Sequence, residues 1–489
     1  MTIAGPKLPR RDLLTAAGRA GTALAATNML RTGASIVAPA AALLPARANA
    51  AGGAELVQPT EIRSQNGVLD ATLKAAPGVV RLGPVTFPGF LYNNAYLPPL
   101  LRVRLGDVMR IHFQNELPDD PSNLHFHGML VSPQGNSDNV FIHVHPGMDF
   151  QYEVKIPAND RQGPGLLWYH PHVHGVVDEQ VLGGLSGGLV VDGFEKYYPI
   201  LKDLPERFIF IKHYISADGE IISLNGQINP NVTIKPGEVQ FWRIAHIGAS
   251  LFIKFAMAGL PLYVIATDGH PMASPKLMTE IFISPGQRID AIVIGPAAGE
   301  YAVRTIPFQN QAWKAPDAAQ QIGTVVATGT PVTGQPTAKE ILALQVQGDQ
   351  WIDVIRKTPI ARRRVLDFSR SADRQTFMIN GQVMNEDRID ETVKLGDTEE
   401  WTVVNTDQQY HSFHIHQTAF LVTEINGVPQ QETSLRDTFP VPPATEIGYS
   451  SLKVVIPFTD PIILGKFVYH CHAVDHEDKG MMGIIEVVA

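Results

Sequence analysis

Three segments of the chain repeat one pattern, and this repetition constrains the fold more than any other feature of the sequence. Each segment has a short alternating run, a Gly-Asp or Gly-Glu turn, and a second alternating run. The segments are RVRLGDVMRIHFQN (residues 102–115), TIKPGEVQFWRIAH (233–246) and TVKLGDTEEWTVVN (392–405). Their glycines lie 131 and 159 residues apart, which is too far for a solenoid repeat but suits three β-sandwich domains of one type.

The composition favours short strands and many turns over long helices. The 489 residues include 42 glycines and 37 prolines, and only 18% are charged. We therefore predict an all-β chain with domains at residues 55–195, 200–330 and 360–489. In the first repeat, Met109, Ile111 and Phe113 should face one way, with Arg110 and His112 facing the other. A net charge of -9 without a basic stripe argues against nucleic-acid binding.

The N-terminus has the features of an export signal. The pair Arg10-Arg11 precedes a mildly apolar run, and small residues at Ala48 and Ala50 offer a cleavage site. We predict that residues 1–50 are a twin-arginine signal and that the mature protein is periplasmic or secreted. The alternative is a basic N-terminus before an alanine-rich arm. Interrupting arginines argue against a membrane anchor, and no other segment is apolar enough to span a membrane.

Four groups of closely spaced histidines predict metal binding. Residues i and i+2 of a strand project to the same face, so a His-x-His pair presents two imidazoles side by side. One such pair is weak support, but four pairs make a structural coincidence a poor explanation. The groups are His125/His127, His170/His172 with His174 nearby, His411/His414/His416 and His470/His472/His476.

Cys471, the single cysteine, lies between His470 and His472 and excludes an internal disulfide. On a strand its side chain points away from both histidines, so it can bind one metal while they bind others. With His411, His476 and Met481 it completes a set of two histidines, one cysteine and one weak methionine, which is typical of a blue copper centre. Zinc would accept cysteine and histidine, but it would not need the methionine.

These motifs together resemble the multicopper oxidases, specifically three-domain, laccase-like bacterial members. The repeats resemble the family's three cupredoxin-like Greek-key β-sandwich domains. The resemblance implies four copper ions, held as one type 1, one type 2 and a type 3 pair. It implies the type 1 ligands His411, Cys471, His476 and Met481, the type 2 ligands His125 and His414, and the type 3 ligands His127, His170, His172, His416, His470 and His472.

The third motif departs from the family pattern at two positions. The family commonly has His-Pro-x-His-x-His-Gly, whereas here Ser412 replaces the proline and Gln417 the glycine. Neither residue is a ligand in the family. We expect these changes to alter packing around the metals, not the number of metals.

The resemblance implies that a phenolic or aromatic-amine substrate gives single electrons at His476 and that O2 is reduced to water. Glu477 and Asp138 are expected to donate or relay protons; the alternative for each is a solvated or turn residue. Met481 predicts a low to moderate potential. We interpret His143 and His145 as strand or surface residues, with an accessory metal site as the alternative.

Other functions remain open at this stage. The main alternative is a metal-ion oxidase acting on Cu(I), Fe(II) or Mn(II), although the 12 methionines form no cluster apart from Met481 and Met482. A non-catalytic scaffold would be expected to lose ligands. A copper nitrite reductase would not need the additional histidines.

Overall fold

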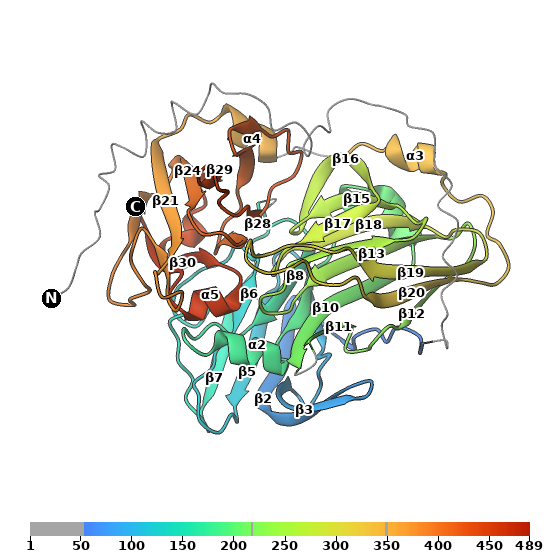
Figure 1. Cartoon of the computed structure of the whole chain (residues 1–489), viewed down its shortest axis with the longest axis horizontal. Helices are drawn as coiled ribbons and strands as arrows, with labels where there is room; N and C mark the ends of the chain where they lie inside the picture. Colours follow the sequence, from blue (N-terminus) through green and yellow to red (C-terminus); the bar gives the residue numbers. More distant parts are fainter. Residues whose placement is uncertain (1–52, 160, 217–218, 348–350) are drawn as a thin grey trace. The chain divides into compact units, whose positions relative to one another are not determined.

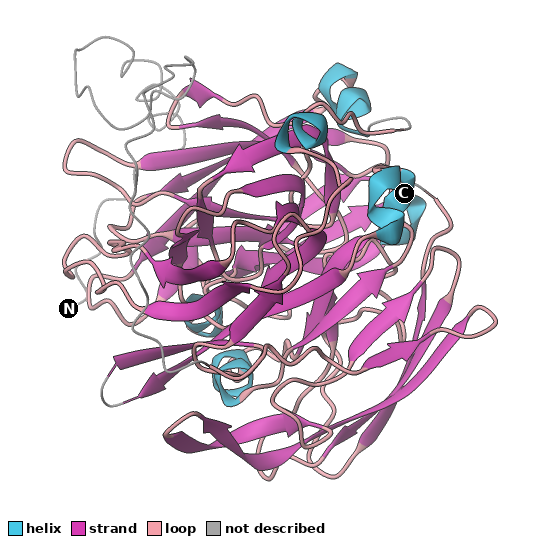
Figure 2. Cartoon of the chain, turned by 90° about the vertical axis from the view of Figure 1, so that its right-hand side faces the viewer, coloured by secondary structure: helices cyan, strands magenta, loops and turns pink. Residues whose placement is uncertain are grey.

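The strands of the computed structural model form six sheets, which fall into three pairs along the chain. The structure describes residues 53–159, 161–216, 219–347 and 351–489, all within one compact unit. The predicted signal at residues 1–50 lies outside the described residues. Strands dominate and the helices are short, so the predicted all-β fold is confirmed (Figure 1 and Figure 2).

The first sandwich spans residues 61–191 and packs a five-stranded sheet (β1-β4-β9-β8-β6) on a four-stranded sheet (β3-β2-β5-β7). Leu73 and Met109 of one sheet meet Leu189 of the other in its core. Its strands are β1 (Glu61–Arg63), β2 (Val68–Leu82), β3 (Val85–Tyr92), β4 (Leu100–Val103), β5 (Val108–Asn115), β6 (His125–His127), β7 (Asp149–Lys155), β8 (Gly165–His170) and β9 (Gly187–Val191).

The second sandwich spans residues 206–327, with sheets of order β11-β10-β13-β18-β15-β16 and β12-β20-β19-β14-β17. Trp242 and Ile253, from opposite sheets, meet in its core. Its strands are β10 (Glu206–Ser216), β11 (Gly219–Leu224), β12 (Asn231–Ile234), β13 (Val239–His246), β14 (Ile253–Met257), β15 (Leu262–Thr267), β16 (His270–Met278), β17 (Glu280–Ile283), β18 (Arg288–Ile294), β19 (Gly299–Thr305) and β20 (Gln321–Ala327).

The third sandwich spans residues 362–488, with sheets of order β22-β21-β24-β29-β26-β27 and β23-β31-β30-β25-β28. Trp401 and Phe413, from opposite sheets, meet in its core. Its strands are β21 (Arg362–Arg370), β22 (Phe377–Ile379), β23 (Glu391–Lys394), β24 (Thr398–Asn405), β25 (His411–Ile415), β26 (Leu421–Ile425), β27 (Val428–Pro429), β28 (Thr438–Val441), β29 (Ser450–Pro457), β30 (Gly465–Cys471) and β31 (Met482–Val488).

Short helices occupy connections between strands. They are α2 (Val177–Gly183), η1 (Phe194–Lys196), η2 (Pro199–Asp203), α3 (Ala338–Leu342), α4 (Trp351–Lys357), η3 (Pro461–Ile463) and α5 (Val474–Asp478). Within the described residues, none of the helices has the length and apolar character needed to cross a membrane.

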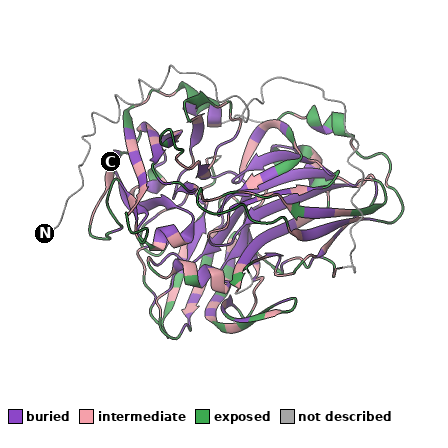
Figure 3. Cartoon of the chain, viewed as in Figure 1, coloured by how far each residue is buried: buried purple, intermediate pink, exposed green. Residues whose placement is uncertain are grey.

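Each sequence repeat carries the chain from one sheet of a sandwich to the other. The glycine turns join β4 to β5, β12 to β13 and β23 to β24, and in every case the two strands belong to different sheets. Gly106, Gly237 and Gly396 adopt φ of 87°, 74° and 99°, a region that glycine enters without steric cost. Side chains in β5 alternate between core and surface as predicted, and Figure 3 shows the buried strand interiors.

Candidate metal centres

One cluster of possible ligands lies inside the third sandwich, where β25, β30 and α5 meet. The Sγ of Cys471 lies 3.5 Å from the Nδ1 of His411 and 3.5 Å from the Nδ1 of His476, and the two Nδ1 atoms are 3.0 Å apart. All three residues are buried. One sulfur and two imidazole nitrogens thus converge on one point, as the sequence predicts.

Met481 lies at the end of the segment that begins at Cys471, and backbone hydrogen bonds tie it to the cluster residues. Its backbone N–H donates to the carbonyl of His476 (3.0 Å), and its carbonyl accepts from the N–H of Cys471 (3.1 Å). Its side chain is fully buried in the same core as Cys471. The residues from Cys471 to Met481 therefore form one hydrogen-bonded loop, which carries two of the three residues of the cluster.

A second set of histidines lies between the first and third sandwiches. The Nε2 of His470 lies 3.2 Å from the Nε2 of His172 and 3.2 Å from that of His416. The Nε2 of His472 lies 3.1 Å from the Nδ1 of His127. The two neighbours of Cys471 thus contact histidines of the first sandwich, while its sulfur faces the other cluster.

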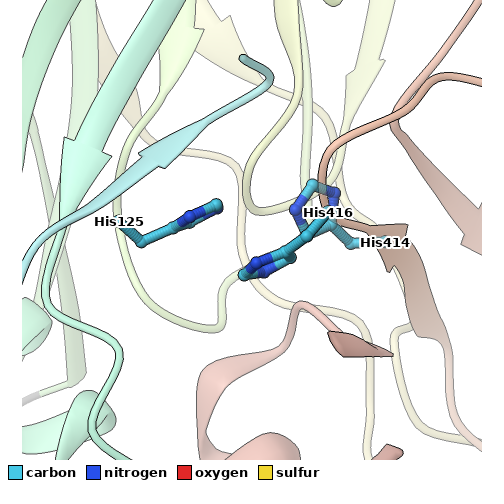
Figure 4. Close-up of side chains that lie close together, drawn as sticks. All are labelled: His125, His414 and His416. Carbon is cyan, nitrogen blue, oxygen red and sulfur yellow. The ribbon is translucent and has the colours of Figure 1, made fainter. Parts of the chain in front are cut away.

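Strand pairing places the remaining histidines in the same region. His125 lies opposite His170 in the β6–β8 pair, and His414 lies opposite His470 in the β25–β30 pair. The Nε2 atoms of His125, His170 and His414 are buried without a hydrogen-bond partner in the described part of the chain. Figure 4 shows His125 of the first sandwich facing His414 and His416 of the third.

The prediction that each pair lies on a strand is only partly correct. His125 and His127 both lie on β6, but His172, His416 and His472 follow the last residues of β8, β25 and β30. Each of these three imidazoles nevertheless contacts another histidine of the set: His172 and His416 contact His470, and His472 contacts His127. The i, i+2 argument therefore describes the first pair and does not describe the other three.

The electrostatics keep these imidazoles neutral. Burial lowers the pKa of the histidines in both clusters, and the neighbouring histidines lower most of them further. Neutral imidazoles keep a lone pair for a metal. Buried nitrogens without partners are costly, and a bound ion would satisfy them. Nitrogen and sulfur donors of this kind fit copper.

Asp138 lies directly beside His125. Its Oδ1 is 3.0 Å from the Nδ1 of His125 and accepts a 2.9 Å bond from the backbone N–H of Phe126. Its Oδ2 accepts a 2.6 Å bond from the Gln417 amide. Burial raises the pKa of Asp138 to about 7, although the two hydrogen bonds oppose this. The carboxyl orients the ring of His125.

Glu477 lies in α5 behind two of the histidines. Its Oε2 is 3.0 Å from the Nδ1 of His470, and its Oε1 is 3.5 Å from the Nδ1 of His172. The Nδ1 of His470 makes its hydrogen bond with the Cys471 carbonyl (3.1 Å) and not with Glu477. Both carboxyl oxygens of Glu477 are therefore buried without a hydrogen-bond partner among the described residues. Burial raises the pKa of Glu477 to about 7, while His172 lowers it.

His476 is the more accessible of the two histidines beside Cys471. It is 5% exposed, against 0% for His411. Its Nε2 lies 3.2 Å from the Gln409 amide, and its ring stacks on Phe377 at 4.0 Å. An external reductant can therefore approach this ligand more closely than His411.

Sequence reasoning missed a buried ion pair beside the histidines. Arg288 of β18 donates two 2.7 Å hydrogen bonds to Asp437, whose Oδ1 lies 3.1 Å from the Nε2 of His127. The Asp437 carbonyl also lies 2.8 Å from the Nδ1 of His414. Through Arg288, the second sandwich therefore contacts a residue that lies against the histidine cluster. The pair joins residues 149 positions apart, so no local pattern reveals it.

A second missed residue is Asp407. Its Oδ2 lies 3.7 Å from the Nε2 of His411, and its Oδ1 accepts a 3.1 Å bond from Arg370. Residues 406–410 form an irregular connection between β24 and β25, so no local sequence pattern marks Asp407.

Histidines outside these clusters lie elsewhere. His143 and His145 are exposed, and the Nε2 of His143 lies 3.4 Å from Glu386. His213 and His246 are buried in the second sandwich. Neither pair belongs to a potential metal-binding group in the part of the chain that the structure describes.

Comparison with known proteins agrees with this geometry. Three multicopper oxidase family models match residues 79–196, 192–330 and 357–489. The chain is 26% identical over 451 residues to the multicopper oxidase mco of Staphylococcus haemolyticus, covering 87% of this chain and 90% of that protein.

Two solved structures share the fold. A multicopper oxidase from Campylobacter jejuni, described as a metallo-oxidase, has a TM-score of 0.74 at 23% identity, covering 89% of this chain and 95% of that one. A laccase-like multicopper oxidase, CueO, from Ochrobactrum sp. has a TM-score of 0.73 at 22% identity, covering 88% and 100%. The chain therefore belongs to the multicopper oxidase family and is a copper-binding oxidoreductase that uses O2.

Proposed function

We propose that this protein is a laccase-like oxidase that couples one-electron oxidation of phenols or aromatic amines to four-electron reduction of O2 to water. The observation that carries the proposal is the position of Cys471, whose sulfur faces one cluster while its two neighbours face another. Three consecutive residues thus connect the two sites through covalent bonds.

The convergent donors support four copper ions. His411, Cys471, His476 and Met481 would hold the type 1 ion, and His125 and His414 the type 2 ion. The type 3 pair would be held by His127, His170, His172, His416, His470 and His472. When bound, copper supplies one-electron redox chemistry at the first site and O2 reduction at the second.

Two acids are positioned to handle protons. Reduction of O2 to water consumes protons at the histidine cluster, which is closed off from solvent. Glu477 contacts His470 and His172, and Asp138 contacts His125, so each carboxyl reaches a different part of that cluster. We infer that both hold and release protons there.

A metal-ion oxidase is the second candidate, and the carboxylates beside the cysteine cluster favour it. The Oδ2 of Asp407 is buried without a hydrogen-bond partner among the described residues, 3.7 Å from His411. Asp475 lies beside His476, with 3.8 Å between its Oδ1 and the Nε2. Carboxylate oxygens of this kind could hold Fe(II) or Mn(II) close to the point where electrons enter.

The two candidates are separated by O2 uptake of the copper-loaded protein with 2,6-dimethoxyphenol or with Fe(II). The laccase proposal predicts that the protein takes up O2 with the phenol. It also predicts that the rate of this uptake in Asp407→Asn stays within about twofold of the parent rate. Uptake with Fe(II) alone, lost in Asp407→Asn, would replace the laccase proposal with the metal-ion one. A copper-loaded protein that consumes no O2 with either reductant would contradict both.

We also infer export by the twin-arginine route to the periplasm or the medium. The support is the Arg10-Arg11 pair and the small residues Ala48 and Ala50, which offer a cleavage site. Replacing both arginines by lysine should retain the protein in the cytoplasm, as cell fractionation would show. Unchanged export of that variant would contradict the inference.

A further inference from the structure

Gln417 has an unusual backbone conformation and lies next to a histidine of the cluster. Its φ is 55°, in the left-handed region that disfavours residues other than glycine, asparagine and aspartate. It directly follows His416, and its side chain is buried, being 2% exposed. Strained conformations of non-glycine residues persist where the surroundings enforce them, and they gather at functional sites.

The side chain of Gln417 makes one contact that a glycine could not make. Its Nε2 donates a 2.6 Å hydrogen bond to the Oδ2 of Asp138, which lies in the first sandwich 279 residues earlier. The other oxygen of Asp138 contacts His125 and the N–H of Phe126. The amide therefore fixes the carboxyl oxygen that His125 leaves free.

His125 is contacted on one side by His416 and on the other by Asp138, which Gln417 holds. The rings of His125 and His416 stack at 3.8 Å with 8° between their planes. Gln417 directly follows His416 and donates a hydrogen bond to Asp138. Asp138 in turn contacts the Nδ1 of His125. The orientation of the His125 ring is thereby set from both sides, while its Nε2 stays without a partner in the described part of the chain.

We propose that Gln417 is a positioning residue for the type 2 copper site, where its amide holds the Asp138 carboxyl and thereby the metal-binding ring of His125. This inference rests on the proposed function, because it needs copper at His125 and His414. Residues that orient a metal ligand typically change metal affinity about 10- to 100-fold when they are lost.

Two variants separate the hydrogen bond from the backbone strain. Gln417→Met keeps the side-chain length and the unfavourable φ but removes the donor, whereas Gln417→Gly removes the donor and relieves φ. Thr418→Val, next along the chain, is the matched control, since it loses a 3.0 Å bond to the Pro457 carbonyl that does not involve the cluster. The copper-loaded proteins are titrated with EDTA while the type 2 EPR signal and the type 1 blue absorbance are followed.

Both Gln417 variants should lose the type 2 signal at roughly 10-fold lower EDTA than the parent or Thr418→Val, with the blue absorbance unchanged. Type 2 copper that resists EDTA as in the parent would overturn the proposal. So would parallel loss of both signals, which would indicate a general folding role. If the parent itself took up no copper, the proposed function would fail instead, so the two failures are distinguishable.

Discussion

At the scale of single residues, Ser412 brings a hydrogen-bond donor to the cysteine. Its backbone N–H donates to the Sγ of Cys471 at 3.3 Å. A proline at this position, as is common in the family, has no N–H to donate. Such a bond stabilises negative charge on sulfur, which is greatest when the copper is reduced, so it raises the potential.

Ser412→Pro should therefore lower the type 1 reduction potential by tens of millivolts, on a scale where about 59 mV is a tenfold change in a one-electron equilibrium. Ser412→Ala is the control, because it keeps the N–H and loses only the contacts of the hydroxyl, to the Ser284 hydroxyl (3.0 Å) and the Pro285 carbonyl (3.5 Å). Spectroscopic redox titration measures both. A potential that falls equally in the two variants would show that the hydroxyl, and not the N–H, is responsible.

Glu477 is expected to matter for O2 reduction and not for oxidation of the reductant. Glu477→Gln keeps the shape of the side chain but cannot hold an exchangeable carboxyl proton between His470 and His172. We expect kcat to fall about 10²-fold or more, with anaerobic bleaching of the blue band by substrate unchanged. Stopped-flow measurements separate these steps, and slower anaerobic bleaching would contradict the assignment.

The site residues differ in how well sequence could predict them. Cys471 and the ten histidines stand in closely spaced motifs, and the structure brings them together, although three of the four His-x-His pairs extend past the end of a strand. Asp437, Arg288 and Asp407 act through contacts set by tertiary packing, so nothing in their own neighbourhoods distinguishes them. Gln417 was visible as a departure from the motif, but its bond to Asp138 depends on how two sandwiches meet.

At the scale of elements, the loop from Cys471 to Met481 positions two of the three residues of the cysteine cluster, while β25 supplies His411. Two backbone hydrogen bonds close this loop, and α5 lies within it. The repeats predicted strand, turn and strand, and these are present. They could not show that each turn crosses between sheets, because the pairing partners, such as β31 for β23, lie far along the chain.

Met481→Leu tests the methionine that would be the weak ligand of the type 1 ion. Leucine is similar in size and apolar, so the fully buried site should keep its packing, while the weak thioether donor is lost. The type 1 potential should rise, because the thioether stabilises oxidised copper, and the blue colour should remain. Redox titration against the parent measures this, and an unchanged potential would show that Met481 does not act on the metal.

At the scale of the whole molecule, the three sandwiches are held together at the metal region. Arg288 of the second sandwich pairs with Asp437 of the third, which contacts His127 of the first. Arg288 also donates to the carbonyls of Leu166 and Asp268. The Arg288 guanidinium thus donates to Leu166 in the first sandwich and to Asp268 in the second. It also pairs with Asp437, which directly precedes β28 of the third.

Removing one partner of this ion pair should be costly. Arg288→Met leaves the Asp437 carboxylate buried and unpaired, and we expect a loss of about 3–5 kcal/mol of stability. Arg63→Met is the surface control, since Arg63 is more than half exposed in its pair with Glu61 and should cost under about 1 kcal/mol. Thermal unfolding of the copper-loaded proteins compares them, and similar midpoints would contradict a role in joining the sandwiches.

The most direct test of the central claim is the copper content of the purified, copper-loaded protein and of Cys471→Ser, measured together with their visible and EPR spectra. The account predicts four copper ions per chain and a blue band in the parent. It predicts three ions, no blue band and a retained type 2 signal in Cys471→Ser. A parent that binds no copper, or a blue band that survives in Cys471→Ser, would contradict the claim that this cysteine joins two copper sites.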